Sequence, residues 1–103
     1  MMPAPVTDAA VLLMRALRID ARSAGATMIV RATDERCWAS ATFAGIRHRI
    51  DLAVEPGPAA DAWLGALAEA DLPMRGHVVA DLIVDRHAAG VRLEILTIEH
   101  DPA

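Results

Sequence analysis

The sequence contains no lysine, asparagine, glutamine or tyrosine, so all ten of its basic residues are arginine. This composition is typical of a GC-rich genome and favours a bacterial source. Side-chain amides are frequent in the recognition of bases and sugars, and none is present here. Together with a formal net charge of −4, their absence argues against a nucleic-acid partner.

The sequence also has no long apolar run. No segment approaches the roughly 20 apolar residues of a membrane helix, and no basic region precedes the apolar residues 9–14 as it would in a signal peptide. A single cysteine, Cys37, excludes an internal disulfide. We therefore expect a cytoplasmic protein without a membrane partner.

Motifs that carry chemistry are missing too. There is no glycine-rich phosphate loop, no CxxC, no HExxH and no GxSxG, and neither Ser23 nor Ser40 follows a strand-to-helix elbow. Asp85 and His87 offer two ligands on one strand, which is too few for a metal site. The sequence predicts no cofactor and no bound metal.

What remains is enough for one folded domain. The chain has 103 residues, of which 54% are apolar, above the roughly 45–50% of an average domain. A chain of this length can bury its own core without a disulfide or a metal. We expect a single α+β domain over residues 1–103, with loose tails at 1–6 and 101–103.

Two β-rich runs, residues 77–86 and 91–99, flank a turn at 87–90 and predict a hairpin. Pairing of Arg86 with Val91 sets the register, so that one face carries Leu82 with Ile95 and Val84 with Leu93. The same register places Val78 and Ala80 opposite Glu99 and Thr97. It places four apolar residues on the other face, namely Val79, Ile83, Leu96 and Ile98. A hairpin that is apolar on both faces needs cover on both.

The N-terminal half predicts a helix over about 7–15 and then four strands. Short turn signals at residues 24–25, 34–35 and 44–45 separate the predicted strands, which are 16–23, 26–33, 36–43 and 46–54. The alternation of Leu17, Ile19 and Ala21 with charged residues favours a strand from 16. A single helix over residues 7–20 is the alternative.

A second helix is predicted over residues 58–71. Pro58 suits a first helical turn, and Leu72-Pro73 ends the segment. The resulting order is α-β-β-β-β-α-β-β, a mainly antiparallel sheet of about six strands with helices on one face. This order is similar, at the level of the fold alone, to that of the small acidic dimeric chaperones of type III secretion, which have a further closing helix. No residue motif accompanies that resemblance.

Arginine side chains gather on one face of the predicted strands. In the register above, Arg18 lies opposite Arg31, Trp38 follows in the same row, and Arg47 and Arg49 share the face. Arginines beside an exposed tryptophan can bind a phosphate or a carboxylate by ion pairing and stacking. These five residues are the candidate site for a small anionic ligand.

His48 falls on the inner face of the same strands, where a helix would cover it. It is the candidate residue for an enzyme with a pocket between helix and sheet. In this register Cys37 lies opposite Leu52, about 13 Å along the strand from His48. That separation is too large for a thiolate–imidazolium pair, so we name no catalytic residue.

The second apolar face of the hairpin indicates self-association. Val79, Ile83, Leu96 and Ile98 are the predicted interface of a homodimer. Residues 1–54 carry seven arginines against five acidic residues, and residues 55–103 carry three against nine, so the two halves have opposite charge. The predicted function is a homodimeric, non-enzymatic module that binds a protein partner along a sheet edge or an apolar groove. The anionic-ligand site and the His48 enzyme are the alternatives.

Overall fold

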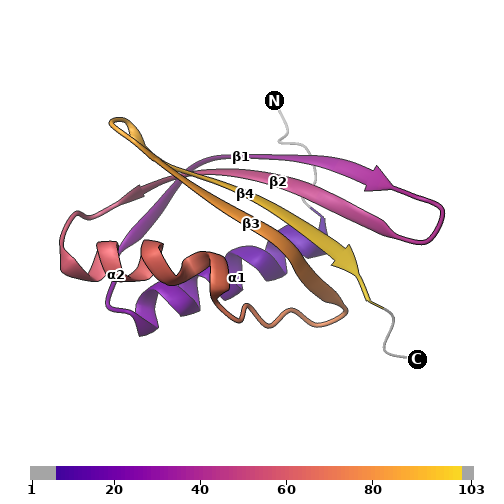
Figure 1. Ribbon diagram of the computed structural model, residues 1–103, viewed down its shortest axis with the longest axis horizontal. Helices are drawn as coiled ribbons and strands as arrows, with labels where there is room; N and C mark the ends of the chain where they lie inside the picture. Colours follow the sequence, from indigo (N-terminus) through magenta and orange to yellow (C-terminus); the bar gives the residue numbers. More distant parts are fainter. Residues whose placement is uncertain (1–6, 101–103) are drawn as a thin grey trace.

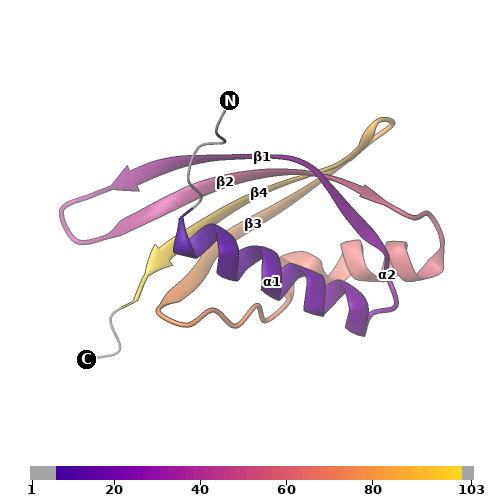
Figure 2. The ribbon, with the colours of Figure 1, turned by 180° about the vertical axis from the view of Figure 1, so that it is seen from behind.

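A computed structural model describes residues 7–100, which form one four-stranded antiparallel sheet covered on one face by two helices (Figures 1 and 2). The tails predicted at 1–6 and 101–103 lie outside the described residues. The elements in chain order are α1 (Asp8–Ser23), β1 (Met28–Ala39), β2 (Ala44–Val54), α2 (Pro58–Ala66), a 3₁₀ turn (Leu67–Glu69), β3 (His77–His87) and β4 (Gly90–Glu99). The strands are ordered β1-β2-β4-β3.

The prediction of about six strands is wrong, and the first reason lies in residues 16–23, which belong to α1. Leu17 and Ala21 are buried and continue the stripe begun by Leu13, whereas Ile19 is 57% exposed. The spacing of the buried residues is therefore that of a helix. The alternative of one helix over 7–20 describes this segment, and Arg18 does not lie opposite Arg31 in a sheet.

The second reason is that the predicted strands 26–33 and 36–43 are largely one strand, β1. Asp34 and Glu35 do not form a turn, because they pair with Arg49 and His48 of β2. Two adjacent acidic residues are tolerated within a strand here because β1 lies at the edge of the sheet, where its charges meet solvent. The turn follows at residues 40–43, where the Ser40 side chain accepts a hydrogen bond from the Phe43 amide.

The centre of the β3–β4 hairpin has the predicted register. Leu82 pairs with Ile95, and His87 pairs with Gly90, which leaves only two residues in the turn. A register shift between Val79 and Asp81 changes the pairing further along, because an inserted residue reverses the alternation of side chains beyond it.

The consequence is that Val79 pairs with Thr97 and packs against the core, while Val78 pairs with Ile98 on the other face. The predicted pairs of Val78 with Glu99, Ala80 with Thr97 and Val79 with Ile98 are therefore wrong.

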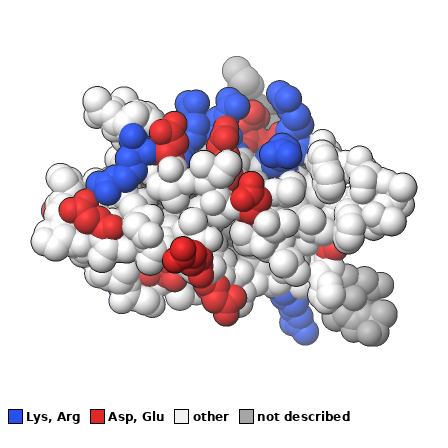
Figure 3. All heavy atoms as spheres, in the orientation of Figure 1, with Lys and Arg blue, Asp and Glu red and all other residues white. Residues whose placement is uncertain are grey.

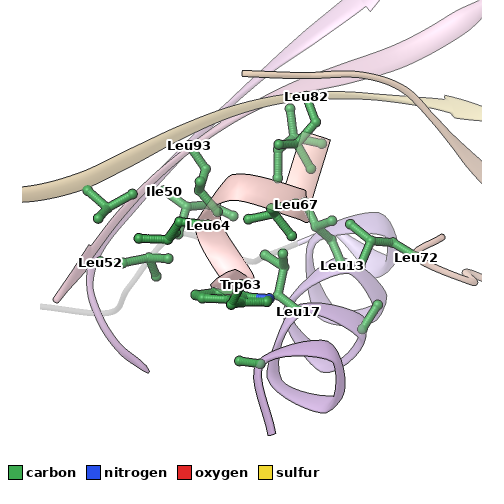
Figure 4. Packing of buried hydrophobic residues seen from close by; sticks show 14 of the residues in the cluster. Leu13, Leu17, Ile50, Leu52, Trp63, Leu64, Leu67, Leu72, Leu82 and Leu93 are labelled. Atoms are coloured by element: carbon green, nitrogen blue, oxygen red, sulfur yellow. The ribbon is translucent and has the colours of Figure 1, made fainter. Parts of the chain in front are cut away.

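The core lies between the two helices and the central strands β2 and β4 (Figure 4). Leucine and isoleucine side chains from the sheet contact leucines of both helices. The fully buried leucines include Leu13 and Leu17 of α1, Leu67 of the 3₁₀ turn and Leu93 of β4. Trp63 of α2 lies 3% exposed, and its Nε1 donates a hydrogen bond of 2.9 Å to Asp20 of α1. This bond joins the two helices at the base of the core.

Helix α2 begins at Pro58, as predicted, but ends at Ala66 rather than at residue 71, and Leu67 continues in the 3₁₀ turn. No helix within residues 7–100 combines the length and the apolar character needed to cross a bilayer.

Candidate functional site

A groove of about 830 Å³ separates helix α1 from the edge strand β1. Figure 2 shows the arrangement: α1 crosses the helical face of the sheet, and β1 rises from its C-terminal end and runs back above it. The residues that line the groove come from α1 (Ala10, Val11, Leu13, Met14, Arg15, Arg18, Ile19 and Arg22), from β1 (Thr33, Asp34 and Glu35) and from β2 (His48 and Ile50).

The groove exists because α1 is held to β1 at its two ends. At the C-terminal end, α1 leads into the tight turn at Gly25, whose φ of 77° suits glycine. At the N-terminal end, Thr7 hydrogen-bonds to Glu35 through its backbone nitrogen and its hydroxyl. Between these ends the core-facing stripe of α1 packs below the central strands, and the neighbouring stripe is left facing β1.

That neighbouring stripe is basic. Val11, Arg15, Arg18 and Arg22 are spaced by four, three and four residues, which places them on one side of the helix. Arg15, Arg18 and Arg22 form no ion pair with any of the described residues. The arginines that do form ion pairs there are Arg49, Arg86 and Arg92. The helix wall of the groove therefore presents positive charge that has no partner within residues 7–100.

The opposite wall and the floor differ in character. Glu35 of β1 is already engaged by Thr7, and Asp34 faces Arg49 across the strand pair. The apolar floor has Met14 at its surface, above the buried Leu13 and Ile50, and the exposed side chains of Val11 and Ile19 add apolar surface beside it. The groove thus combines an apolar floor with a basic wall, which suits a ligand that is itself apolar and acidic.

His48 lies in the floor and is 4% exposed. Its Nε2 is 2.8 Å from the hydroxyl of Thr97 on β4, so that the two buried polar groups satisfy each other. Burial lowers the pKa of His48; the carboxylate of Glu35 opposes this shift, and the proximity of His77 adds to it. The prediction that His48 lies on the helical side of the sheet is confirmed.

The prediction that Cys37 lies opposite Leu52 is wrong, because β1 pairs with β2 in a different register. Cys37 pairs with Ile46 at the far end of β1 and is exposed. It is not among the residues that line the groove. The groove is lined by no cysteine, serine or lysine, so His48 has no nucleophile of these kinds beside it.

The five residues of the predicted anionic-ligand site are not brought together. Arg18 belongs to α1 and lines the groove. Arg31 sits in the irregular part of β1, where it donates a 3.4 Å hydrogen bond to the carbonyl of Ala89. Trp38, Arg47 and Arg49 lie on the face of the sheet that the helices leave open, as their cross-strand pairing shows.

This open face is mixed in character. Ile83 and Val78 are about half exposed, at 51% and 49%. Cross-strand ion pairs join Arg49 to Glu94 at 3.8 Å and Arg92 to Asp51 at 2.9 Å. The hydrogen bond from Arg92 holds the pKa of Asp51 below its usual value. Figure 3 shows blue arginine atoms gathered along the upper margin of the molecule, where Figure 1 draws β1 and β2, with red acidic atoms among and below them.

Sequence reasoning missed the groove because it divided α1 into a helix and a strand. Val11, Arg15 and Arg22 were not proposed as site residues. The signal was present in the four-three-four spacing of Val11, Arg15, Arg18 and Arg22, which becomes meaningful once residues 8–23 form one helix.

Comparison of the chain with protein-family models, with curated proteins and with solved structures finds no match. Within residues 7–100 no group of three or more histidine, cysteine, aspartate or glutamate side chains is placed to hold a metal ion. The functional argument therefore depends on the geometry of the groove and of the open sheet face.

Proposed function

We propose that this protein is a non-enzymatic binding module that holds an extended acidic and apolar segment of a protein partner in the groove between α1 and β1. The observation that carries the proposal is the groove itself, in which an apolar floor, an unpaired arginine wall and a sheet edge meet. That the protein is a bacterial, cytoplasmic homodimer is a separate proposal, which does not depend on the ligand of the groove.

The edge strand favours an extended ligand. Among residues 7–100, β1 is paired only with β2, so no described strand occupies the backbone groups on its other side. Addition of a peptide strand to an open edge is a common mode of recognition, in which backbone hydrogen bonds contribute affinity and alternate side chains contribute specificity. A strand added to β1 would lie over the groove and direct every second side chain toward α1.

The dimensions agree with this mode. α1 has 16 residues and is therefore about 24 Å long, which corresponds to about seven residues of extended chain. Three or four side chains of such a segment would enter the groove. Apolar ones would pack on Val11, Met14 and Ile19, and carboxylates would reach Arg15, Arg18 and Arg22.

An enzyme that uses His48 keeps one supporting observation, since His48 borders the groove. We favour binding because the Nε2 of His48 is engaged by Thr97 and because none of the groove residues is a serine, cysteine or lysine. In the proposed module His48 acts as part of the floor.

The test is the binding of a fluorescein-labelled peptide, LSESLSESL, measured by fluorescence anisotropy. Its alternate positions present leucine and glutamate to the groove, and a matched peptide carries lysine in place of glutamate. We expect the glutamate peptide to bind at least about 10-fold more tightly than the lysine peptide, because like charges placed together oppose association. Equal affinities for the two peptides would rule the proposal out.

Two further measurements locate the binding. Arg18→Glu should raise the dissociation constant of the glutamate peptide about 10-fold or more, whereas Arg75→Glu, an equal change of charge outside the groove, should leave it nearly unchanged. An extended peptide has two hydrogen-bonding edges, each formed by alternate backbone nitrogens. N-methylation of one set of nitrogens in one peptide, and of the other set in a second peptide, blocks one edge in each. Only the peptide whose blocked edge faces β1 should lose binding. If both methylated peptides bind normally, the ligand does not add to the strand edge.

A further inference from the structure

The face of the sheet opposite the helices carries charge in an ordered way. One row across the four strands consists of Arg36 on β1, Arg47 on β2, Leu96 on β4 and Asp81 on β3. The row therefore runs from positive through apolar to negative. Arg36, Arg47 and Asp81 are exposed, and no ion pair within the described residues involves them.

The neighbouring rows give the face its apolar area and two more charged pairs. On one side of this row, Trp38 and Gly45 continue into Ile98 and Val78. On the other side, Arg49 lies beside Glu94, and in the row after that Asp51 lies beside Arg92. Each of these pairs places one charge on β2 and the opposite charge on β4.

We propose that a second copy of this chain covers the open face, related to the first by a two-fold axis that runs parallel to the strands between β2 and β4. This rotation places β1 of each copy over β3 of the other and β2 over β4. Face-to-face sheets in proteins keep their mean strand directions within about 30° of each other, which such a rotation satisfies. This interface lies on the face opposite the groove and is independent of the proposed ligand.

Charge complementarity favours this axis. Because the rotation keeps each row in place and exchanges its ends, Arg36 meets Asp81 of the second copy. By the same operation Arg49 meets Glu94 of the second copy, and Asp51 meets Arg92. Each of these three contacts joins opposite charges and by symmetry occurs twice. Arg47, Asp34 and Asp85 instead meet Leu96, Ile83 and Ala32 of the second copy.

A two-fold axis perpendicular to the strands and midway between the rows of Arg47 and Arg49 gives a less complementary contact, although it places Arg36 over Asp34. It places Arg47 of one copy over Arg49 of the second copy, and places Leu96 over Glu94. Juxtaposed like charges and desolvated carboxylates oppose association. With the perpendicular axis at this position the arginines of β2 oppose each other, whereas the axis parallel to the strands places no like charges opposite one another.

A charge exchange between positions 36 and 81 tests the interface and its orientation together. Wild-type protein should sediment as a dimer in analytical ultracentrifugation at several concentrations. Arg36→Asp and Asp81→Arg should each raise the dimer dissociation constant at least about 10-fold, because each places two like-charged pairs in the interface. In an equimolar mixture of the two variants, the altered position 36 meets the altered position 81 and the second contact is native, so the dimer should return with near wild-type affinity.

Circular dichroism of each variant verifies that the exposed substitutions leave the fold intact. Leu96→Arg, which the axis places opposite Arg47 of the second copy, should also give a folded monomer. A wild-type monomer at all concentrations would overturn the proposal, and would leave this face to a different protein. If Arg36→Asp and Asp81→Arg dimerise as tightly as the wild type, the dimer interface lies on another surface and the proposal is wrong. Failure of the mixture to restore a dimer that each variant has lost would overturn the proposed axis.

Discussion

Thr7 and Glu35, which are 28 positions apart in the sequence, join the N-terminus of α1 to the edge strand β1. The backbone nitrogen of Thr7 donates to Oε1 of Glu35 at 3.2 Å, and the Thr7 hydroxyl donates to Oε2 at 2.8 Å. The same hydroxyl accepts a hydrogen bond of 3.1 Å from the backbone nitrogen of Ala10 and so caps the helix. One side chain therefore both begins α1 and closes one end of the groove.

The first prediction concerns this residue. Thr7→Ala should lower the free energy of unfolding by about 1–2 kcal/mol, because it removes the cap and a hydrogen bond to a carboxylate. Urea denaturation followed by circular dichroism measures the change. Thr7→Ser retains the hydroxyl and should lose only a small part of the stability. Equal stabilities of the alanine variant and the wild type would show that the Thr7 hydroxyl contributes nothing to anchoring α1.

The second prediction is a pH dependence of stability that arises from His48. Burial holds the pKa of the folded His48 below its ordinary value of 6.5, so the unfolded chain binds a proton more readily than the folded one. The contribution of this residue is fully present above about pH 6.5 and is lost as the pH falls toward the folded pKa, with a slope of at most about 1.4 kcal/mol per pH unit.

Urea denaturation between pH 7.5 and 5.5 measures this slope, above the range in which most carboxylates titrate. His48→Gln keeps a polar side chain near Thr97 but does not titrate, so its stability should vary less with pH across the same interval. If the wild type and His48→Gln show the same pH dependence, the buried imidazole is not its source.

The third prediction compares two glycines. A Cβ added at Gly45 would lie 2.5 Å from the carbonyl oxygen of Thr97 and 3.3 Å from Cε3 of Trp38, so β2 and β4 would have to separate. Gly45→Ala should lower the free energy of unfolding by about 1–3 kcal/mol, as overpacking commonly does. The matched control is Gly65→Ala in α2, where a Cβ has no neighbour within 4 Å and alanine favours the helix by up to about 1 kcal/mol.

Thermal and urea unfolding of both variants measure this comparison. We expect the two substitutions to have opposite signs. A neutral Gly45→Ala would mean that β2 and β4 do not approach as closely at this position as the structure places them.

Local patterns were sufficient for several elements. Pro58 marks the start of α2, and the alternation of apolar residues in 77–99 predicts the hairpin and the pairing of Leu82 with Ile95. The hairpin is predictable because its two strands are adjacent in the sequence and their register follows from a short turn. The placement of His48 on the helical face follows from the same period of two in β2.

Other features depend on contacts between distant segments. Leu17, Ile19 and Ala21 have the spacing of a strand, whereas Leu13, Leu17 and Ala21 have that of a helix. Burial of the Leu13–Leu17–Ala21 stripe beneath the central strands selects the helix. An irregularity in β3 around Ala80 turns Val79 toward the core, a shift that no local pattern indicates.

The composition and periodicity of this chain specify an α+β domain without a recognisable catalytic motif. The groove and the open face are properties of the tertiary structure alone, because each is formed where segments far apart in the sequence meet. Arg18 and Glu35 line one groove only because Thr7 anchors α1 to β1. Arg36 and Asp81 stand at opposite ends of one row only because β2 and β4 lie between β1 and β3. Side-chain periodicity sets the face on which a residue lies, whereas its neighbours on that face are set by the order in which the strands pair.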